Sequence, residues 1–343
     1  MRRMLLACAS LFVLCTWSAG ARAQTVDDDE TIRVKSDLVI LNVGVADQKG
    51  RPILDLGRGD FLVYEDGVRQ TITSFEPTQT PFSLVLLLDM SGSTLNFRTS
   101  LKQAATRFID ALGPDDRVAV VTFHAAKKKG RTEDKIETLA PFTTNRRKIV
   151  EAISLAEGAG ETNLYKALNY SLKELDKEGK RRKAVVVLTD GIDTDLDRQD
   201  RTVTSSAATN EEAIAALKPD ASPMLNAVLN AADRQGVTIY PMALPSGDPK
   251  KFEPLTPPQA AKYVAARARL EVLANRTGGQ LHNVYRLEDM GRIYAQVAAE
   301  MRTLYSLAYQ SAGNKHDGNW RAITVEVARP DTVARTRPGY YAK

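Results

Sequence analysis

The sequence predicts an α/β fold in which a doubly wound, mostly parallel sheet is inserted in, or flanked by, a small β-sandwich. From residue 82 to about 300, continuous apolar segments alternate with amphipathic ones. This pattern is typical of parallel strands covered on both faces by helices. Before and after this region, shorter segments alternate apolar and polar residues, as strands with one buried face do. The length of 343 residues is sufficient for this arrangement.

The first 23 residues are predicted to be a secretory signal peptide. The basic start MRRM precedes the apolar run LLACASLFVLCTW, and small residues at Ala21 and Ala23 precede the expected cleavage site. The apolar run is shorter than the roughly 20 residues that span a bilayer, which favours cleavage over an uncleaved anchor. We therefore expect a periplasmic or secreted protein. Cys8 follows Leu-Leu-Ala, as a lipoprotein cysteine can, but the apolar run before it is very short. Cys15 follows Leu14, where a small residue would be expected, so a lipid-anchored protein is the less favoured alternative.

Cleavage after Ala23 would change both the charge and the cysteine content of the protein. The signal contains both cysteines, three arginines and no acidic residue, so 44 basic and 42 acidic residues remain, a net charge of +2 instead of +5. A charge this small does not indicate nucleic-acid binding. An exported chain without disulfides must be stabilised by its core or by a metal.

The segments between the signal peptide and residue 80 are predicted to be a lead-in and β-strands. Residues 24–35 carry an acidic run and are expected to be disordered. In residues 36–80, the stretch LVILNVGV places four branched apolar side chains on one face of a strand. The stretch DFLVYEDGVRQTITSF predicts two strands joined by a turn at Asp66 and Gly67, because Asp-Gly favours a tight hairpin turn.

The central domain, residues 82–300, is predicted to alternate strands and helices. Apolar strands are expected at 83–89, 117–123, 183–190 and 237–244, and a less apolar edge strand at 134–142. Amphipathic helices are expected at 98–112, 146–158, 164–178, 260–279 and 287–305. The polar or Pro-rich segments 198–222 and 246–258 are predicted to be loops.

The tail, residues 303–343, is predicted to return to β-structure, because ITVEV alternates apolar and polar residues. Few strands are available in either flank, and neither flank alone is expected to bury a core. We therefore predict that residues 36–80 and 303–343 pair in one β-sandwich into which the central domain is inserted. Two independent β appendages on the central domain are the alternative.

Five oxygen-bearing side chains lie where predicted strands end or a predicted helix begins: Asp89, Ser91, Ser93, Thr162 and Asp190. In open α/β sheets, ligands bind at the edge formed by the carboxyl ends of the strands. Taken singly, each of these residues is equally typical of a helix cap or a turn. Together they offer oxygens at one edge, and oxygen is the ligand that hard divalent cations bind.

The order of these residues resembles the metal-ion-dependent adhesion site of von Willebrand factor A (VWA) domains. That site has Asp-x-Ser-x-Ser in a first loop, a threonine in a second and an aspartate in a third. The resemblance covers about residues 82–300, and the flanks, with the ending RPGYYA, resemble the bacterial exported VWFA-related family. It implies a divalent metal held by these five residues: Asp89, Ser91, Ser93, Thr162 and Asp190. Mg²⁺ is preferred, with Mn²⁺ or Ca²⁺ as alternatives, because Ca²⁺ favours more carboxylates.

The resemblance further implies a protein-binding module for adhesion or interaction, in which the metal captures an acidic side chain of a partner protein. One alternative is a structural assembly protein whose metal only stabilises loops. Another is a metal-dependent phosphohydrolase with Asp89 as phosphoryl acceptor, but that class has a second aspartate where this sequence has Ser91. The three histidines lack triad spacing. We therefore expect no enzymatic activity, no small-molecule substrate and no nucleic-acid ligand.

A second acidic group, at Asp193, Asp195 and Asp197, has the spacing of the start of an EF-hand calcium loop. The sixth position of such a loop requires glycine and the twelfth glutamate, and this sequence has Arg198 and Thr204 there. We therefore predict a solvated acidic loop that contributes charge to the rim of the metal site.

Overall fold

The computed structural model describes residues 38–128, 131–247, 254–311 and 317–342. The chain divides into two units, Met1–Lys35 and Ser36–Lys343, and the elements below belong to the second. The predicted signal peptide, residues 1–23, and the predicted lead-in, residues 24–35, lie outside the described residues. In the described part of the chain, no helix is long and apolar enough to cross a membrane.

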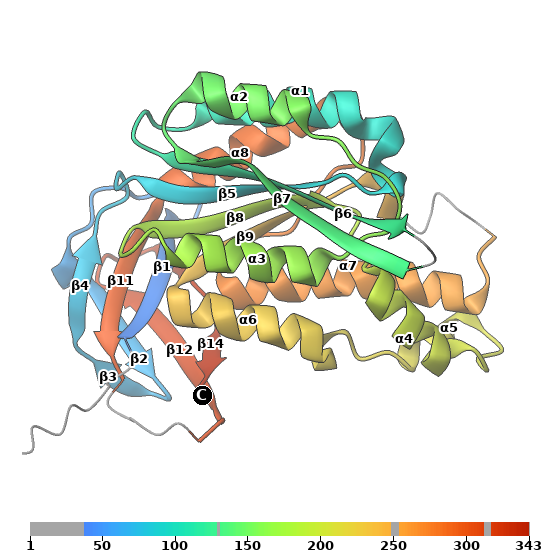
Figure 1. Cartoon of the computed structure of the whole chain (residues 1–343). Coiled ribbons are helices and arrows are strands. Elements are labelled where there is room, and N and C mark those ends of the chain that lie inside the picture. The colour runs from blue at the N-terminus through green and yellow to red at the C-terminus, as the bar shows by residue number, and fades with distance from the viewer. Residues whose placement is uncertain (1–37, 129–130, 248–253, 312–316, 343) are drawn as a thin grey trace, which may run out of the picture. The chain divides into compact units, whose positions relative to one another are not determined.

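A six-stranded sheet in the order β10-β9-β8-β5-β6-β7 forms the centre of this unit (Figure 1). Its strands are β5 (Phe82–Asp89), β6 (Arg117–Lys128), β7 (Arg131–Thr143), β8 (Arg182–Thr189), β9 (Val237–Ala243) and β10 (His282–Asn283). Neighbouring strands are parallel except β6 and β7, which pair antiparallel at the edge. Every residue of β5, β8 and β9 is buried, which explains their continuous apolar sequences.

Helices cover both faces of this sheet (Figure 1). One layer contains α1 (Arg98–Ala111), α2 (Arg146–Leu155) and α8 (Met290–Arg302), and the other contains α3 (Leu164–Asp176), α6 (Pro223–Gln235) and α7 (Pro257–Thr277). Alternate residues of β5 serve the two layers: Leu84 and Leu86 pack in the first, Val85 and Leu87 in the second. The predicted fold class, a doubly wound and mostly parallel sheet with antiparallel β-structure beside it, is confirmed.

The prediction that residues 198–222 form a loop is wrong, because this region holds α4 (Thr194–Thr204) and α5 (Asn210–Ala215). The side chain of Asp193 accepts hydrogen bonds from the first turn of α4 and so starts the helix. The buried face of α4 carries charge: Asp200 receives two hydrogen bonds from Arg269 of α7, at 2.6 and 2.8 Å. The sequence of α4 therefore lacks the apolar repeat of an amphipathic helix, although α4 packs against α7.

Two antiparallel sheets contain the remaining strands, in the orders β13-β1-β11-β4 and β14-β12-β2-β3. The strands are β1 (Leu38–Asp47), β2 (Phe61–Glu65), β3 (Val68–Gln70), β4 (Ile72–Glu76), β11 (Leu304–Gln310), β12 (Trp320–Val327), β13 (Thr332–Arg335) and β14 (Gly339–Tyr341). Each sheet combines strands from both flanks of the central domain, since β1 pairs with β11 and β2 with β12. Apolar residues of both sheets form one core. The turn predicted at Asp66 and Gly67 joins β2 and β3, and both residues have positive φ.

This sandwich contacts the central domain at the amino ends of the parallel strands (Figure 1). Asn42 of β1 donates a hydrogen bond to the hydroxyl of Thr238 in β9, at 2.9 Å. The buried carboxylate of Asp233, at the end of α6, pairs with Arg276 of α7 at 3.0 Å and with Arg337 of the tail at 2.8 Å. The carboxyl ends of the strands, where the predicted metal ligands lie, form the opposite edge of the sheet.

Candidate metal centre

The two predicted aspartate ligands lie at the ends of neighbouring strands. Asp89 is the last residue of β5, and Asp190 directly follows β8, the parallel neighbour of β5. Both side chains are almost completely buried, with 0% and 1% of their residue surface exposed. Because parallel strands end at the same edge, the fold brings these two carboxylates together although about 100 residues separate them.

The hydroxyl-bearing residues converge on the same place. Ser93, Thr162 and Asp190 line a pocket of about 560 Å³. Ser91 is buried, and its hydroxyl lies 3.1 Å from that of Ser93. Asp89 lies beside these residues, because the charge of Asp190 contributes to the raised pKa of the Asp89 carboxyl. The structure thus assembles all five predicted residues at one edge of the sheet, and their ligation of a metal stays a prediction.

Burial and a neighbouring acid both disfavour the ionised form of Asp89. Burial, together with the charge of Asp190, raises the pKa of Asp89 from 3.8 to about 7. Hydrogen bonding by the Ser91 side chain and backbone and by Thr189 opposes this effect. The Ser91 backbone N–H donates to Asp89 at 3.0 Å, and the Thr189 hydroxyl donates at 2.8 Å. These hydrogen bonds do not cancel the cost of burying the charge, because the pKa of Asp89 remains raised. A positive charge nearby would stabilise the ionised carboxylate.

Asp190 has an unpaired oxygen. Its Oδ1 accepts a hydrogen bond from the backbone N–H of Ile192 at 3.0 Å, but its buried Oδ2 has no hydrogen-bond partner among the described residues. Burial raises the pKa of this carboxyl, while the nearby Ser93 hydroxyl acts in the opposite direction. A buried carboxylate oxygen without a partner is costly, and an ion bound there would remove that cost.

These residues fit a small divalent cation. Two carboxylates offset a charge of +2, and three hydroxyls supply neutral oxygen ligands, a donor set suited to Mg²⁺. The described residues contain no group of three or more His, Cys, Asp or Glu side chains that could hold a metal. A metal at this edge therefore depends on the serine and threonine hydroxyls.

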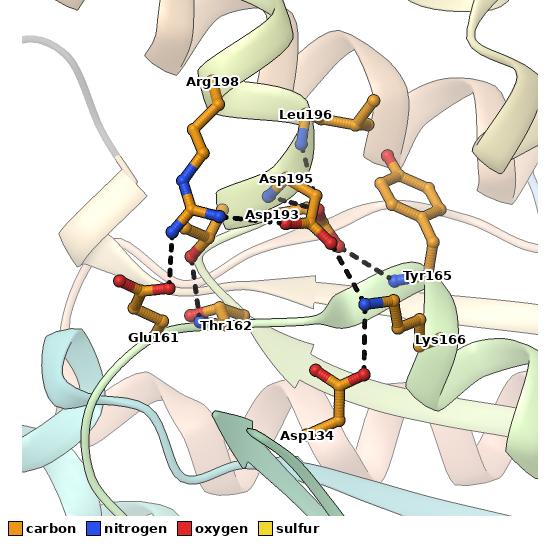
Figure 2. Close-up of polar contacts among 10 residues, drawn as sticks. Asp134, Glu161, Thr162, Tyr165, Lys166, Asp193, Asp195, Leu196 and Arg198 are labelled. Atoms are coloured by element: carbon orange, nitrogen blue, oxygen red, sulfur yellow. Dashed lines mark hydrogen bonds and ion pairs between the residues drawn. The ribbon is translucent and has the colours of Figure 1, made fainter. Parts of the chain in front are cut away.

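The loop that carries Thr162 is fixed by the loop that follows Asp190. The backbone N–H of Thr162 donates to the Thr194 hydroxyl at 3.1 Å, and the Thr194 N–H donates to the Thr162 carbonyl at 2.9 Å. Asp193 accepts a hydrogen bond from the N–H of Tyr165 in the first turn of α3, at 3.3 Å (Figure 2). The N-cap position of α3 is Asn163, so Thr162 is not used as the cap.

Ion pairs surround this loop contact (Figure 2). Lys166 lies 3.0 Å from Asp134 and 3.1 Å from Asp195, and Arg198 lies 2.9 Å from Glu161 and 3.2 Å from Asp195. These contacts connect β7, the Thr162 loop with the start of α3, and α4. Exposed pairs of this kind contribute little individually, but as a network they hold the three segments in one arrangement.

The prediction that residues 193–197 form a solvated acidic loop is wrong. Asp193 and Asp197 are buried, and all three acids lie at the start of α4. Asp193 caps the helix, Asp195 joins the ion pairs described above, and Asp197 accepts from Arg201 at 2.6 Å. Each acid thus has a structural role, in place of the calcium-binding role that the spacing first suggested.

Three residues of the site were not predicted from the sequence. Thr189 supports Asp89, and its signal was its place beside Asp190 in the stretch LTDG. Lys262 and Tyr263 line the pocket from α7. No local pattern in the sequence indicates that α7 reaches this edge, since its residues are distant in sequence from every predicted ligand.

Comparison with protein families supports this assignment of the fold. Residues 84–192 match the model of the von Willebrand factor type A domain. The matched range contains all five predicted ligands. The central sheet with its two helical layers therefore has a VWA-type fold, and the antiparallel sheets are additions to it. A comparison with curated proteins found no match.

Solved structures similar to this chain include several bacterial proteins. BatB from Bacteroides thetaiotaomicron is 15% identical, with a TM-score of 0.43, and the match covers 64% of this chain and 98% of that one. The vWF domain of the type V pili tip protein Mfa5 from Porphyromonas gingivalis is 13% identical, with a TM-score of 0.45 and coverage of 64% and 95%. The pilus adhesin SpaC from Lactobacillus rhamnosus GG is 10% identical, with a TM-score of 0.44 and coverage of 89% and 47%.

Proposed function

We propose that the chain is an exported protein-binding module that uses a divalent metal, preferably Mg²⁺, to capture an acidic side chain of a partner protein. The residues that would hold the metal are Asp89, Ser91, Ser93, Thr162 and Asp190. Export rests on the predicted signal peptide at residues 1–23. The partner class rests on the resemblance of the site to metal-dependent adhesion sites and on the match of residues 84–192 to the VWA domain.

The observation that carries this proposal is the pair of buried carboxylates at the sheet edge. Asp89 and Asp190 lie close enough for the charge of one to raise the pKa of the other, and one oxygen of Asp190 has no partner among the described residues. Two like charges in a buried site are unfavourable unless a cation compensates them. A purely structural role of these acids would not explain why Asp190 lines a pocket of about 560 Å³ together with Ser93 and Thr162.

The composition of the donor set favours binding of a further anion. The two carboxylates balance the charge of a divalent metal, and the hydroxyls add none, so the loaded site retains no surplus negative charge to repel a ligand. When bound, the metal would supply a strong electrostatic contact to a carboxylate of the partner. The chain's own residues would hold the metal, expose it through the pocket and exclude water on the buried side.

The metal site can be tested by calorimetric titration with Mg²⁺. We expect the wild type to bind one ion per chain and Asp190→Asn to bind at least tenfold more weakly. Asp115→Asn, which changes an exposed carboxylate in the loop before β6 at the opposite edge of the sheet, is the matched control and should bind within about twofold of the wild type. Equal affinity of Asp190→Asn and the wild type would show that the metal is not held here.

Capture of a partner can be tested in an affinity isolation from the extracytoplasmic fraction. We expect a protein that is retained in Mg²⁺, released by a chelator and not retained by Asp190→Asn, while the circular dichroism of the bait stays unchanged. A partner that remains bound in chelator, with the fold intact, would instead support the structural alternative in which the metal stabilises only the loops.

A further inference from the structure

Among the described residues that line the candidate metal pocket, one carries a positive charge. Lys262, on α7 near its amino end, lines the pocket together with Asp190, Thr162 and Ser93. Its positive charge acts on the carboxylate of Asp190. The residue is half-buried.

The ammonium group of Lys262 lies over an aromatic ring. It lies 4.6 Å from the centroid of the Tyr263 ring, within the range of a cation–π contact. No carboxylate in the described part of the chain forms an ion pair with it. By contrast Lys166, the lysine of the neighbouring rim, lies within 3.1 Å of two aspartates. Lys262 therefore has capacity for an anion that Lys166 has already used.

We propose that Lys262 is the second anchor for the acidic ligand, so that the incoming carboxylate is bound by the metal through one oxygen and by the Lys262 ammonium through the other. This inference rests on the proposed function and adds a residue that determines ligand specificity. It assigns the ligand class as a carboxylate side chain whose two oxygens are both accessible. Lys262 selects such a group against neutral amides.

Replacing Lys262 should affect the affinity for the metal and the affinity for the acidic ligand differently. The ammonium repels a divalent cation in the same pocket, so its removal should not weaken metal binding. The same ammonium attracts the carboxylate of the ligand by its opposite charge. A merely structural residue would affect both bindings in the same direction.

The test uses Mn²⁺ as the metal probe and an N-acetylated, C-terminally amidated Gly/Ser peptide with one glutamate as the ligand probe. Broadening of the peptide NMR signals by the Mn²⁺-loaded full chain gives its affinity. We expect Lys262→Gln to bind the peptide about five- to tenfold more weakly and Mn²⁺ at least as tightly as the wild type. Lys262→Arg should bind the peptide within about threefold of the wild type, because it retains the charge.

Two controls separate the outcomes. Lys173→Gln makes the same change of net charge at an exposed lysine farther along α3 and should leave the peptide affinity within twofold. Unchanged glutamate-dependent binding in Lys262→Gln, or weakened Mn²⁺ binding in that variant, would overturn the role of Lys262 alone. A wild type that does not bind Mn²⁺, or does not distinguish the glutamate peptide from its glutamine counterpart, would overturn both this role and the proposed function.

Discussion

Replacing Asp89 by Asn should stabilise the metal-free protein at alkaline pH. Since the pKa of Asp89 rises from 3.8 to about 7 on folding, the folded chain holds a proton that the unfolded chain releases. Metal-free stability is therefore complete below about pH 4 and decreases as the pH rises to about 7. At pH 8 the ionised carboxylate costs up to about 4 kcal/mol, an order-of-magnitude figure from 1.36 kcal/mol for each pH unit between the two pKa values.

Asparagine removes the charge but gives up part of the hydrogen bonding. Asp89 accepts from the Ser91 N–H through one oxygen and from the Thr189 hydroxyl through the other. An amide keeps a single acceptor oxygen, and the lost hydrogen bond costs about 1–2 kcal/mol. The net gain at pH 8 is then about 2 kcal/mol. Near pH 4 the wild-type carboxyl is already neutral, so only the lost hydrogen bond remains and the variant should be about 1–2 kcal/mol less stable than the wild type.

The assay is urea unfolding followed by circular dichroism, in chelator at pH 8 and at pH 4, and again in Mg²⁺ at pH 8. In Mg²⁺ the order should reverse, since a ligand at a hundred times its Kd stabilises the wild type by about 2.7 kcal/mol and does not stabilise the variant. Two results would contradict the predicted cost of the buried charge: lower stability of Asp89→Asn than of the wild type in chelator at pH 8, or the same stability difference at both pH values.

Three further variants test other parts of the structure. Thr194→Val removes the hydroxyl that accepts from the Thr162 N–H, so Mg²⁺ affinity in calorimetry should fall roughly threefold to tenfold with the fold retained. Asp233→Ala leaves the two arginines of the sandwich junction unpaired and should cost about 3–5 kcal/mol in denaturant unfolding. Gly236→Ala should cost about 2–5 kcal/mol by the same measurement, because its φ is 64° and an added Cβ would lie 2.6 Å from a sandwich side chain. Its control, Gly179→Ala, has a φ of 63° but open space around it and should cost only about 1–2 kcal/mol.

The sequence was sufficient for the elements whose buried faces are apolar. The strands β5, β8 and β9 and the amphipathic helices follow from the repeat of hydrophobic residues, since these elements bury such residues on both faces or along one stripe. The helix α4 was missed because the side chain that it buries toward α7 is Asp200, paired with Arg269. A pattern based on hydrophobicity cannot show that a charged residue has a partner elsewhere in the chain.

The candidate site was also predicted only in part from the sequence. Asp89 and Asp190 could be placed together from the sequence, because both end strands that the apolar pattern identifies as parallel. The functions of Asp193 and Thr194 could not, because each depends on a contact between two loops that differ in sequence position by about thirty residues. Lys262 required knowledge of where α7 lies over the sheet edge, which follows from packing and not from local pattern.

The pairing of β1 with β11 has a consequence for the order in which the protein folds. These strands pair from Leu38 with Gln310 to Gly44 with Leu304, so the first strand of the sandwich finds its partner only after the whole VWA-type domain has been synthesised. Contacts so distant in sequence form slowly. Until then the apolar face of β1, including Leu41 and Val43, lacks its cover. We therefore expect the inserted domain to fold first, with the sandwich closing last and completing the unit.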